Sequence, residues 1–253
     1  MVVGPFCVVG EHAEIGDGTV LEPHAVLDGW TVVGKSCKIG VGVVIGAPPQ
    51  DMKYSGARSW VRIGDRTTLR EYVTVHRSAA PDGETVIGSD GFIMAMAHVA
   101  HDCRIGNHVT ITNYCGVSGH VVVEDHAYLG GLTAFHQNVR IGAFAIVGGN
   151  CGVRMDVVPF AMATGEPLRI YGLNRLGLRR NGFTMEQQKV LKGAFRILFW
   201  SGLNTSDALS RLRAELGAHE NVQRLVRFVE GTKRGLTRGV EVDAGGDAGE
   251  AEL

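Results

Sequence analysis

A six-residue periodicity runs through the first 153 residues of this chain and constrains its fold more than any other feature. Stepping by six from Val3 to Val153 visits 26 positions, and 23 of them hold Val, Ile, Leu or Phe; the exceptions are Asp51, Ala57 and Pro81. Neither the 3.6-residue period of an α-helix nor the two-residue period of a flat strand produces this spacing. A short strand and a turn, repeated, does produce it. The sequence therefore predicts an all-β parallel β-helix, a hexapeptide-repeat solenoid with one large inward side chain per repeat.

The fourth position after each inward residue supports the same fold. It carries mainly Ala, Thr and Val, and all five cysteines fall there: Cys7, Cys37, Cys103, Cys115 and Cys151. One small side chain beside one large one fits the interior of a narrow triangular prism. The cysteines are therefore interpreted as buried hydrophobic residues rather than as disulfides or metal ligands.

Two polar stretches interrupt the repeat, and a different pattern follows it. Residues 47–60 and 77–84 contain both Pro and Gly, which predicts loops that leave the prism. A capping box at Thr184–Gln187 predicts a helix that ends near Trp200, and further helices are expected from about 205 to 217 and from about 220 to 229. We expect a β-helix domain in residues 1–165, a C-terminal α-helical domain in 166–238 and a disordered acidic tail in 239–253.

The composition argues against several classes of function. The formal net charge is −1 over 253 residues, so no overall positive charge is present to attract nucleic acid or an anionic membrane surface. No apolar run approaches the roughly 20 residues of a membrane-spanning helix, and the N-terminus lacks the segments of a signal peptide. We therefore expect a cytoplasmic protein that neither binds nucleic acid nor spans a membrane.

One column of the predicted prism carries groups suited to acyl transfer. Residues three hexads apart stack on successive coils, which are about 4.8 Å apart, so the hexads beginning at Val99 and Val117 lie one above the other. Two positions further on stand His101 and Gly119. A histidine can remove a proton from an attacking hydroxyl group, and a free backbone N–H can stabilise the developing oxyanion.

The other histidines leave alternatives open. Five of them, His12, His24, His108, His120 and His126, occupy the third position after the inward residue, which is normally a solvated turn position. His76, His98, His101 and His136 lie elsewhere in the repeat and favour a functional cluster. A zinc site built from clustered histidines is the rival interpretation, but the spacing gives it weak support, and we expect neither a metal nor a cofactor.

Basic residues follow the prism, and they suit either a phosphate group or an acidic partner protein. A solvated helix face is the alternative interpretation. These residues are Arg169, Arg175, Arg179, Arg180, Lys189, Lys192 and Arg196.

Several segments resemble the UDP-N-acetylglucosamine O-acyltransferases of lipid A biosynthesis. They are AHVAHDCRIGNHV, GVSGHVVVEDHAYLGGLTAFHQNVRIG, GLNRLGLRRNGF, PPQDMKYSG and REYVTVHR, and the resemblance covers residues 1 to about 237. It implies left-handed coiling and a homotrimer with C3 symmetry. It also implies the first step of the pathway, in which a 3-hydroxyacyl chain passes from acyl carrier protein to the 3-hydroxyl group of UDP-N-acetylglucosamine.

The resemblance also implies roles for individual residues. The implied catalytic group is His101 as general base, Asp102 as its support and Gly119 as the oxyanion N–H; adjacent side chains seldom hydrogen-bond directly, however. His98, His120 and His136 would line the sugar and thioester region. The nucleotide diphosphate would contact Gln137, Asn174 and Arg180, and the glucosamine would be reached across a subunit boundary by Asp51, Lys53 and His76. Gly149 would set the acyl-chain length.

The sequence departs from the family pattern in a few places, and other functions stay open. The family usually begins at least one coil earlier, commonly has Asn where Glu166 stands, and sometimes has an acidic residue at Leu176. The acidic tail has no recognised counterpart. An N-acyltransferase of the same fold, acting on a 3-amino sugar nucleotide or on the monoacylated glucosamine of a later step, is the alternative enzyme. A non-catalytic hexapeptide-repeat scaffold is the third possibility.

Overall fold

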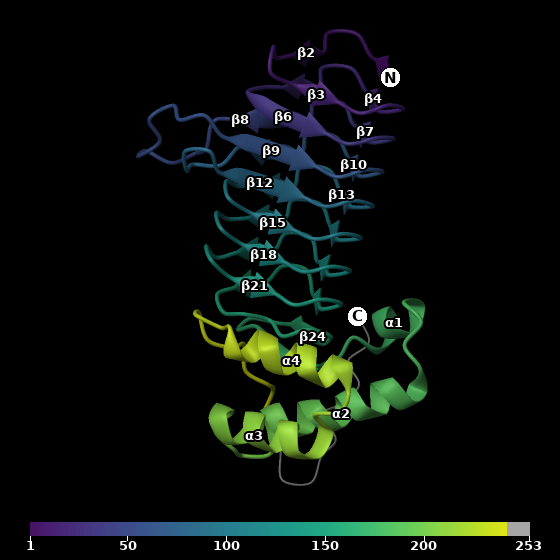
Figure 1. Cartoon of the computed structure of the whole chain (residues 1–253), viewed down its shortest axis with the longest axis vertical. Coiled ribbons are helices and arrows are strands. Elements are labelled where there is room, and N and C mark those ends of the chain that lie inside the picture. The colour runs from purple at the N-terminus through teal and green to yellow at the C-terminus, as the bar shows by residue number, and fades with distance from the viewer. Residues whose placement is uncertain (242–253) are drawn as a thin grey trace.

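The computed structural model describes residues 1–241 and has the shape of a long triangular prism with helices at one end (Figure 1). The N-terminus lies at the far end of the prism from these helices. Most of the predicted acidic tail, residues 239–253, lies outside the described residues.

Three sheets form the sides of the prism, and the chain visits them in turn. The first sheet contains, in spatial order, β1 (Val2–Val3), β4 (Val20–Leu21), β7 (Lys38–Ile39), β10 (Thr68–Leu69), β13 (Phe92–Ile93), β16 (Thr110–Ile111), β19 (Tyr128–Leu129), β22 (Ile146–Val147), β24 (Ala161–Thr164) and β25 (Arg169–Leu173). All neighbours in it are parallel except β24 and β25, which are antiparallel.

The other two sheets are parallel throughout. The second contains β2 (Val8–Val9), β5 (Val26–Leu27), β8 (Val44–Ala47), β11 (Thr74–His76), β14 (His98–Val99), β17 (Gly116–Val117), β20 (Ala134–Phe135) and β23 (Gly152–Val153). The third contains β3 (Glu14–Ile15), β6 (Trp30–Val33), β9 (Trp60–Ile63), β12 (Glu84–Ile87), β15 (Arg104–Ile105), β18 (Val122–Val123) and β21 (Arg140–Ile141). This repeating order confirms the predicted parallel β-helix.

The interior of the prism is apolar, as the six-residue pattern predicts. Inward residues such as Leu27, Ile45 and Val99 are fully buried, and four of the five cysteines are buried beside them as free thiols. Burial raises the pKa of Cys103 to about 12, so this thiol stays protonated and acts as a small hydrophobic group. The first coil is the exception, because Val3 remains 48% exposed at the open N-terminal end of the prism.

Two loops leave the prism without interrupting its sheets. They follow β8 and β11, and β11 still pairs in register with β14, with Val75 opposite Val99. The two loops are tied together, because both Nε and Nη2 of Arg58 donate to Oδ1 of Asp82 at 3.0 and 2.7 Å. Figure 1 shows them projecting from the side of the prism beside β8 and β9.

The C-terminal part contains α1 (Arg175–Arg180), α2 (Met185–Trp200), α3 (Thr205–Leu216) and α4 (Glu220–Glu230). Thr184 forms the predicted capping box at the start of α2, since its side chain accepts from the Gln187 N–H while that of Gln187 accepts from the Thr184 N–H. The short helix α1 was not predicted. Within residues 1–241, no helix combines the length and the hydropathy that crossing a membrane requires.

Candidate active site

The structure stacks the predicted catalytic column as the repeat requires. Val99 of β14 pairs with Val117 of β17, which places the turn after Val99 directly beside the turn after Val117. A Cβ built on Gly119 would lie 2.6 Å from Cε1 and 2.7 Å from Nε2 of His101. The imidazole therefore lies against the open face of Gly119, outside the apolar interior, and only a glycine leaves room for it.

The backbone N–H of Gly119 is free to bind an anion. No acceptor for it is found among residues 1–241. At another corner of the prism two equivalent N–H groups are occupied by side chains of the next coil: Lys35 N–H donates to Asp65 Oδ1 at 2.7 Å, and Asn107 N–H donates to Asp125 Oδ1 at 2.7 Å. The amide beside His101 lacks such a cap, as an oxyanion donor must.

His101 and Asp102 are hydrogen-bonded directly, with 2.7 Å between Nδ1 and Oδ2. The sequence-based expectation that adjacent side chains would not meet is wrong here. Asp102 lies at a prism corner with φ of +62°, the left-handed conformation that residues at many other corners also adopt. Both side chains are largely shielded from solvent, at 12% and 13% exposed.

Two residues of the second loop, Ser78 and Ala79, hold the Asp102 carboxylate. The Ser78 hydroxyl donates to Oδ1, and the Ala79 N–H donates to Oδ2 at 3.2 Å. Burial alone would raise the pKa of Asp102, but the hydrogen bonds from Ser78 and His101 outweigh it and lower the pKa below its ordinary value. Asp102 is therefore an ionised carboxylate at neutral pH.

Sequence reasoning missed Ser78 because the loop disturbs the coil length. Thr74 of β11 lies opposite His98 of β14, a separation of 24 residues rather than the 18 that separate Val99 from Val117. Counting the same 24 residues back from Asp102 leads to Ser78. The interrupted repeat contains this 24-residue spacing, but using it requires knowing which later strand pairs with β11.

Three further histidines surround this pair. The ring of His120 lies edge-on to that of His101 with centroids 5.2 Å apart, and its Nε2 is 3.8 Å from Oδ2 of Asp102. In a second pair, the ring of His98 lies 4.8 Å from that of His76, and Nδ1 of His98 is 2.7 Å from Oγ1 of Thr74. Within one chain these four histidines form a cluster of two contacting ring pairs, His76 with His98 and His101 with His120.

His76 is the most buried member of the cluster. It is 7% exposed, and its Nδ1 has no hydrogen-bond partner in the described part of the chain. Burial, followed by the neighbouring imidazoles of His98 and His101, lowers the pKa of His76 to about 4. Burial likewise lowers the pKa of His98. His76 is therefore neutral at physiological pH and can act as a hydrogen-bonding group without carrying charge.

The geometry of this cluster also has to be compared with that of a metal site. Ligand atoms of His101, Asp102 and His120 all lie within 4.8 Å of one another. However, Nδ1 of His101 already bonds to the carboxylate, whose two oxygens also accept from Ser78 and Ala79. With Nδ1 and both carboxylate oxygens engaged in these bonds, Asp102 acts as the hydrogen-bonded partner of His101, an arrangement that suits an acid–base pair.

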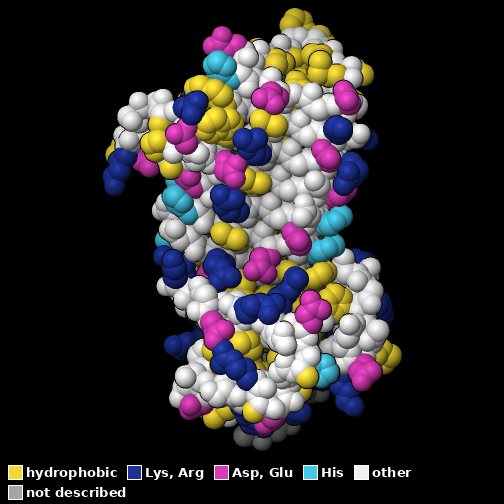
Figure 2. Space-filling model, viewed as in Figure 1, with side chains coloured by type: hydrophobic (Ala, Val, Ile, Leu, Met, Phe, Trp, Pro, Cys, Tyr) yellow, Lys and Arg dark blue, Asp and Glu magenta, His cyan; other side chains and the backbone are white. Residues whose placement is uncertain are grey.

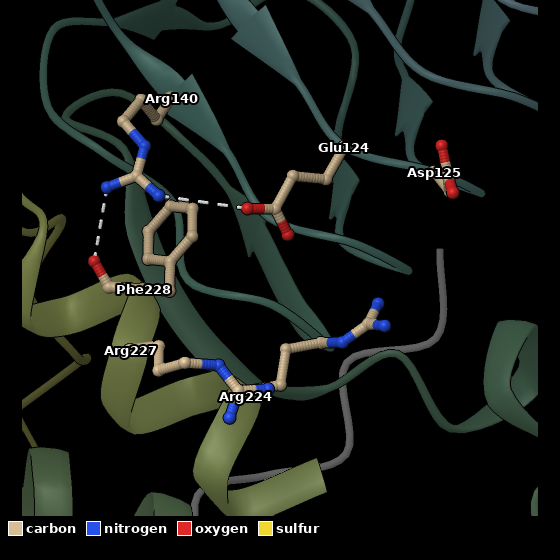
Figure 3. A pocket seen from close by; sticks show the side chains of 6 residues that line it. All are labelled: Glu124, Asp125, Arg140, Arg224, Arg227 and Phe228. Atoms are coloured by element: carbon tan, nitrogen blue, oxygen red, sulfur yellow. Dashed lines mark hydrogen bonds and ion pairs between the residues drawn. The ribbon is translucent and has the colours of Figure 1, made fainter. Parts of the chain in front are cut away.

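A separate hollow lies where α4 meets the third sheet (Figure 3). It has a volume of about 370 Å³, and Arg140 spans it with Nη1 donating to the carbonyl of Phe228 at 3.2 Å and Nη2 3.7 Å from Oε1 of Glu124. None of the predicted catalytic residues lines it. Its lining residues are Glu124, Asp125, Arg140, Arg224, Arg227 and Phe228.

Comparison with known proteins decides the family. Residues 156–237 match the model described as UDP-N-acetylglucosamine O-acyltransferase, domain 2, and residues 84–119 match that of the bacterial transferase hexapeptide. The chain is 48% identical over 239 residues to the acyl-[acyl-carrier-protein]–UDP-N-acetylglucosamine O-acyltransferase of Thermodesulfovibrio yellowstonii, covering 94% of this chain and 93% of that protein. The chain belongs to the UDP-N-acetylglucosamine O-acyltransferase family.

Other members of the family agree with this assignment. The Syntrophobacter fumaroxidans protein of the same description is 42% identical over 240 residues, which is 94% of this chain and 93% of that protein. Among solved structures, LpxA of Acinetobacter baumannii has a TM-score of 0.90 at 34% identity, and the UDP-N-acetylglucosamine O-acyltransferase of Moraxella catarrhalis has 0.88 at 36%. Each comparison covers 93% of this chain and 92% of the other.

Some residues that the family resemblance implicates lie next to the cluster. His136 and Gln137 follow β20, one coil beyond Gly119, and both are exposed. Nδ1 of His136 donates to the carbonyl of Gln137 at 3.2 Å. This arrangement leaves the Gln137 side chain open to solvent on the same column as His101.

Other implicated residues lie elsewhere in this member of the family. Asn174 caps α1, since its Oδ1 accepts from the Gly177 N–H at 3.0 Å and its Nδ2 donates to the Phe144 carbonyl at 2.9 Å. Arg180 is exposed at the end of the same helix. Within residues 1–241, no hydrogen bond or ion pair links these residues to His101.

The loop residues Asp51 and Lys53, and the proposed chain-length residue Gly149, also lie away from His101 within one chain. Asp51 accepts the Lys53 N–H at 2.9 Å in the first loop, and the Lys53 side chain is exposed. Gly149 is exposed beside β22 in the first sheet, where an added Cβ would lie 3.1 Å from the Gly131 carbonyl oxygen. These residues therefore occupy positions from which a neighbouring molecule could be contacted.

Proposed function

We propose that this chain, an acyltransferase of its family, transfers a 3-hydroxyacyl group from acyl carrier protein to the 3-hydroxyl group of UDP-N-acetylglucosamine. The main structural support is the hydrogen-bonded pair of His101 and Asp102 beside the unoccupied Gly119 amide. The names of the relatives support the two substrates. The proposed reaction is the first step of lipid A biosynthesis.

These three residues carry out the proton transfer and the oxyanion stabilisation of the proposed reaction. Since the ionised carboxylate of Asp102 can only accept, Nδ1 of His101 carries the hydrogen and Nε2 is the free base. Nε2 removes the proton from the sugar 3-hydroxyl as its oxygen attacks the thioester carbonyl carbon. The Gly119 N–H holds the resulting oxyanion. When the tetrahedral intermediate collapses, the carbon–sulfur bond breaks, and His101 returns the proton to the departing thiolate.

Asp102 contributes by its charge and by its fixed position. Its low pKa keeps it ionised, so it stabilises the imidazolium that forms when His101 takes the proton. The bond to Nδ1 also fixes the ring so that Nε2 stays near Gly119. His98 and His120 flank the pair, where they can contact the sugar and the thioester.

A homotrimer is proposed from an exposed apolar ridge. Tyr72, Met96, Tyr114 and Leu132 occupy equivalent corner turns on successive coils, and they are between 46% and 65% exposed. A continuous apolar ridge along a prism is typical of a surface that is buried between subunits. Threefold association would also let Asp51 and Lys53 reach a neighbour's site. A monomer by sedimentation at micromolar concentration would contradict this proposal.

The basic residues after the prism are proposed to meet the anionic substrates. Arg179 and Arg180 lie in α1, while Lys189 and Arg196 are exposed on α2. Positive side chains here suit an acidic carrier protein or the diphosphate group. On the face seen in Figure 2, Lys and Arg side chains also gather where the prism meets the helices.

Three finer features belong to the same proposal. Left-handed coiling is supported by Figure 1, in which β6, β9 and β12 run left to right across the near side while the chain descends. The helical part of the division into residues 1–165 and 166–238 is supported by α1 to α4, while β25 still pairs with β24 in the first sheet. A cytoplasmic location follows from the proposed donor, the acyl carrier protein.

The proposal is tested by mass spectrometry of the reaction product. Purified protein is incubated with UDP-N-acetylglucosamine and a panel of 3-hydroxyacyl carrier proteins, and we expect an ester that mild base cleaves. UDP sugars with a 3-amino group serve as the comparison acceptor. An amide formed only with the amino sugar, or no product with either acceptor, would contradict the proposed reaction.

A further inference from the structure

The two loops that leave the prism are braced against each other above Asp102. Besides the ion pair of Arg58 and Asp82, the Asp82 N–H donates to the Arg58 carbonyl at 2.8 Å. The Ser59 hydroxyl donates to the Ser78 carbonyl at 2.6 Å. Residues from the end of the first loop therefore hold the start of the second loop in place.

Ser78 is the point at which this brace reaches the active site. Its side chain is fully buried, as is that of Ser59. Its hydroxyl donates to one oxygen of Asp102, while the next residue, Ala79, donates its N–H to the other oxygen. Hydrogen bonds thus join Ser59 to the backbone of Ser78, the Ser78 side chain to Asp102, and Asp102 to Nδ1 of His101.

We propose that Ser78 is a positioning residue for catalysis, which fixes the Asp102 carboxylate and thereby holds His101 against Gly119. This inference rests on the proposed acyltransferase function. Ser78 touches no substrate in this scheme; its effect passes entirely through Asp102. The role of the second loop is thus to orient the catalytic pair.

The physical basis is the rotation of a carboxylate. Asp102 is linked to its backbone through two rotatable bonds, and its position decides where the His101 ring lies. Ser78 and Ala79 bind the two oxygens separately, which fixes the plane of the carboxylate. Without the Ser78 hydroxyl, one buried oxygen would lose its donor, and the carboxylate would rotate to recover one. Nδ1 of His101 would follow it, away from Gly119.

The test measures kcat and KM separately for Ser78→Ala and for the nearly isosteric Ser78→Cys, whose thiol is a weaker donor. We expect kcat to fall roughly ten- to a hundredfold in Ser78→Ala and less in Ser78→Cys, with KM for both substrates within about twofold of wild type. Ser210→Ala, at an exposed position in α3, is the matched control and should keep the wild-type kcat.

A double-mutant cycle with Asp102→Asn distinguishes a positioning role of Ser78 from a general disruption of the active site. If Ser78 acts through Asp102, adding Ser78→Ala to Asp102→Asn should lower kcat by less than about twofold more. Additive losses, or a wild-type kcat in Ser78→Ala, would overturn the inference while leaving the proposed function intact. An inactive wild-type protein would instead overturn the proposed function itself. Thermal unfolding of each variant shows whether a loss of kcat reflects unfolding.

Discussion

Replacing Gly119 by alanine tests how closely the catalytic groups are packed. The added Cβ would lie 2.6 Å from Cε1 and 2.7 Å from Nε2 of His101, whereas ordinary contacts begin at 3.4 Å. The ring would therefore have to retreat by about 0.8 Å. It is held by the 2.7 Å bond to Asp102, so a retreat of this size stretches or bends that bond.

The expected cost falls on catalysis rather than on folding. Gly119 is not among the residues with positive φ, so its backbone conformation suits alanine. A displacement near 1 Å in a reacting group can cost about 100-fold in rate, which corresponds to about 2.7 kcal/mol of activation free energy. We therefore expect kcat of Gly119→Ala to fall by about two orders of magnitude, with a thermal midpoint close to that of wild type.

The assay is steady-state kinetics with both substrates saturating, accompanied by thermal unfolding of each variant. Gly193→Ala serves as the control, because it lies in α2 and its Cβ would meet nothing closer than 3.8 Å. This control should keep the wild-type kcat. A Gly119→Ala enzyme with kcat within threefold of wild type would refute the close packing of His101 on Gly119.

Two further predictions concern chain length and pH. Gly149→Met should shift the preferred acyl donor to shorter chains, because the added side chain fills space at an exposed glycine. The preference is measured by competition among carrier proteins of different acyl length. An unchanged preference would refute the role of Gly149 in setting chain length. The pKa of His76 falls to about 4 on folding, below its ordinary value near 6.5. Between these two pH values the unfolded chain binds a proton at His76 that the folded chain does not bind. The free energy of unfolding therefore declines as the pH falls from 6.5 towards 4. Between pH 7.5 and 5, wild type should lose about 2 kcal/mol more unfolding free energy than His76→Gln, measured in urea at one protein concentration; equal losses would contradict the buried neutral state.

The repeat made most of the fold predictable. One inward residue every six positions sets the coil, and the coil length then places His101 beside Gly119 without any further information. The same logic predicted all five cysteines as interior residues, which is confirmed for four of them, whereas Cys7 in the first coil is only partly buried. Local capping signals were enough for α2, where Thr184 and Gln187 bond reciprocally as expected.

The missed features depend on geometry that the repeat does not encode. The direct bond between His101 and Asp102 depends on the side-chain orientations of two adjacent residues, which the repeat does not specify. Ser78 reaches Asp102 because β14 pairs with β11 although a loop lies between these strands in the sequence. The helix α1 has six residues, too few to show a helical hydrophobic period.

The most direct test of the proposed chemistry is the turnover of His101→Ala. Loss of the base should reduce kcat by a factor of at least about 100, while sedimentation and thermal unfolding remain those of wild type. A folded His101→Ala protein that forms the ester at a near wild-type rate would show that another group removes the proton. The pairing of an imidazole with a free amide on adjacent coils would then have no part in catalysis.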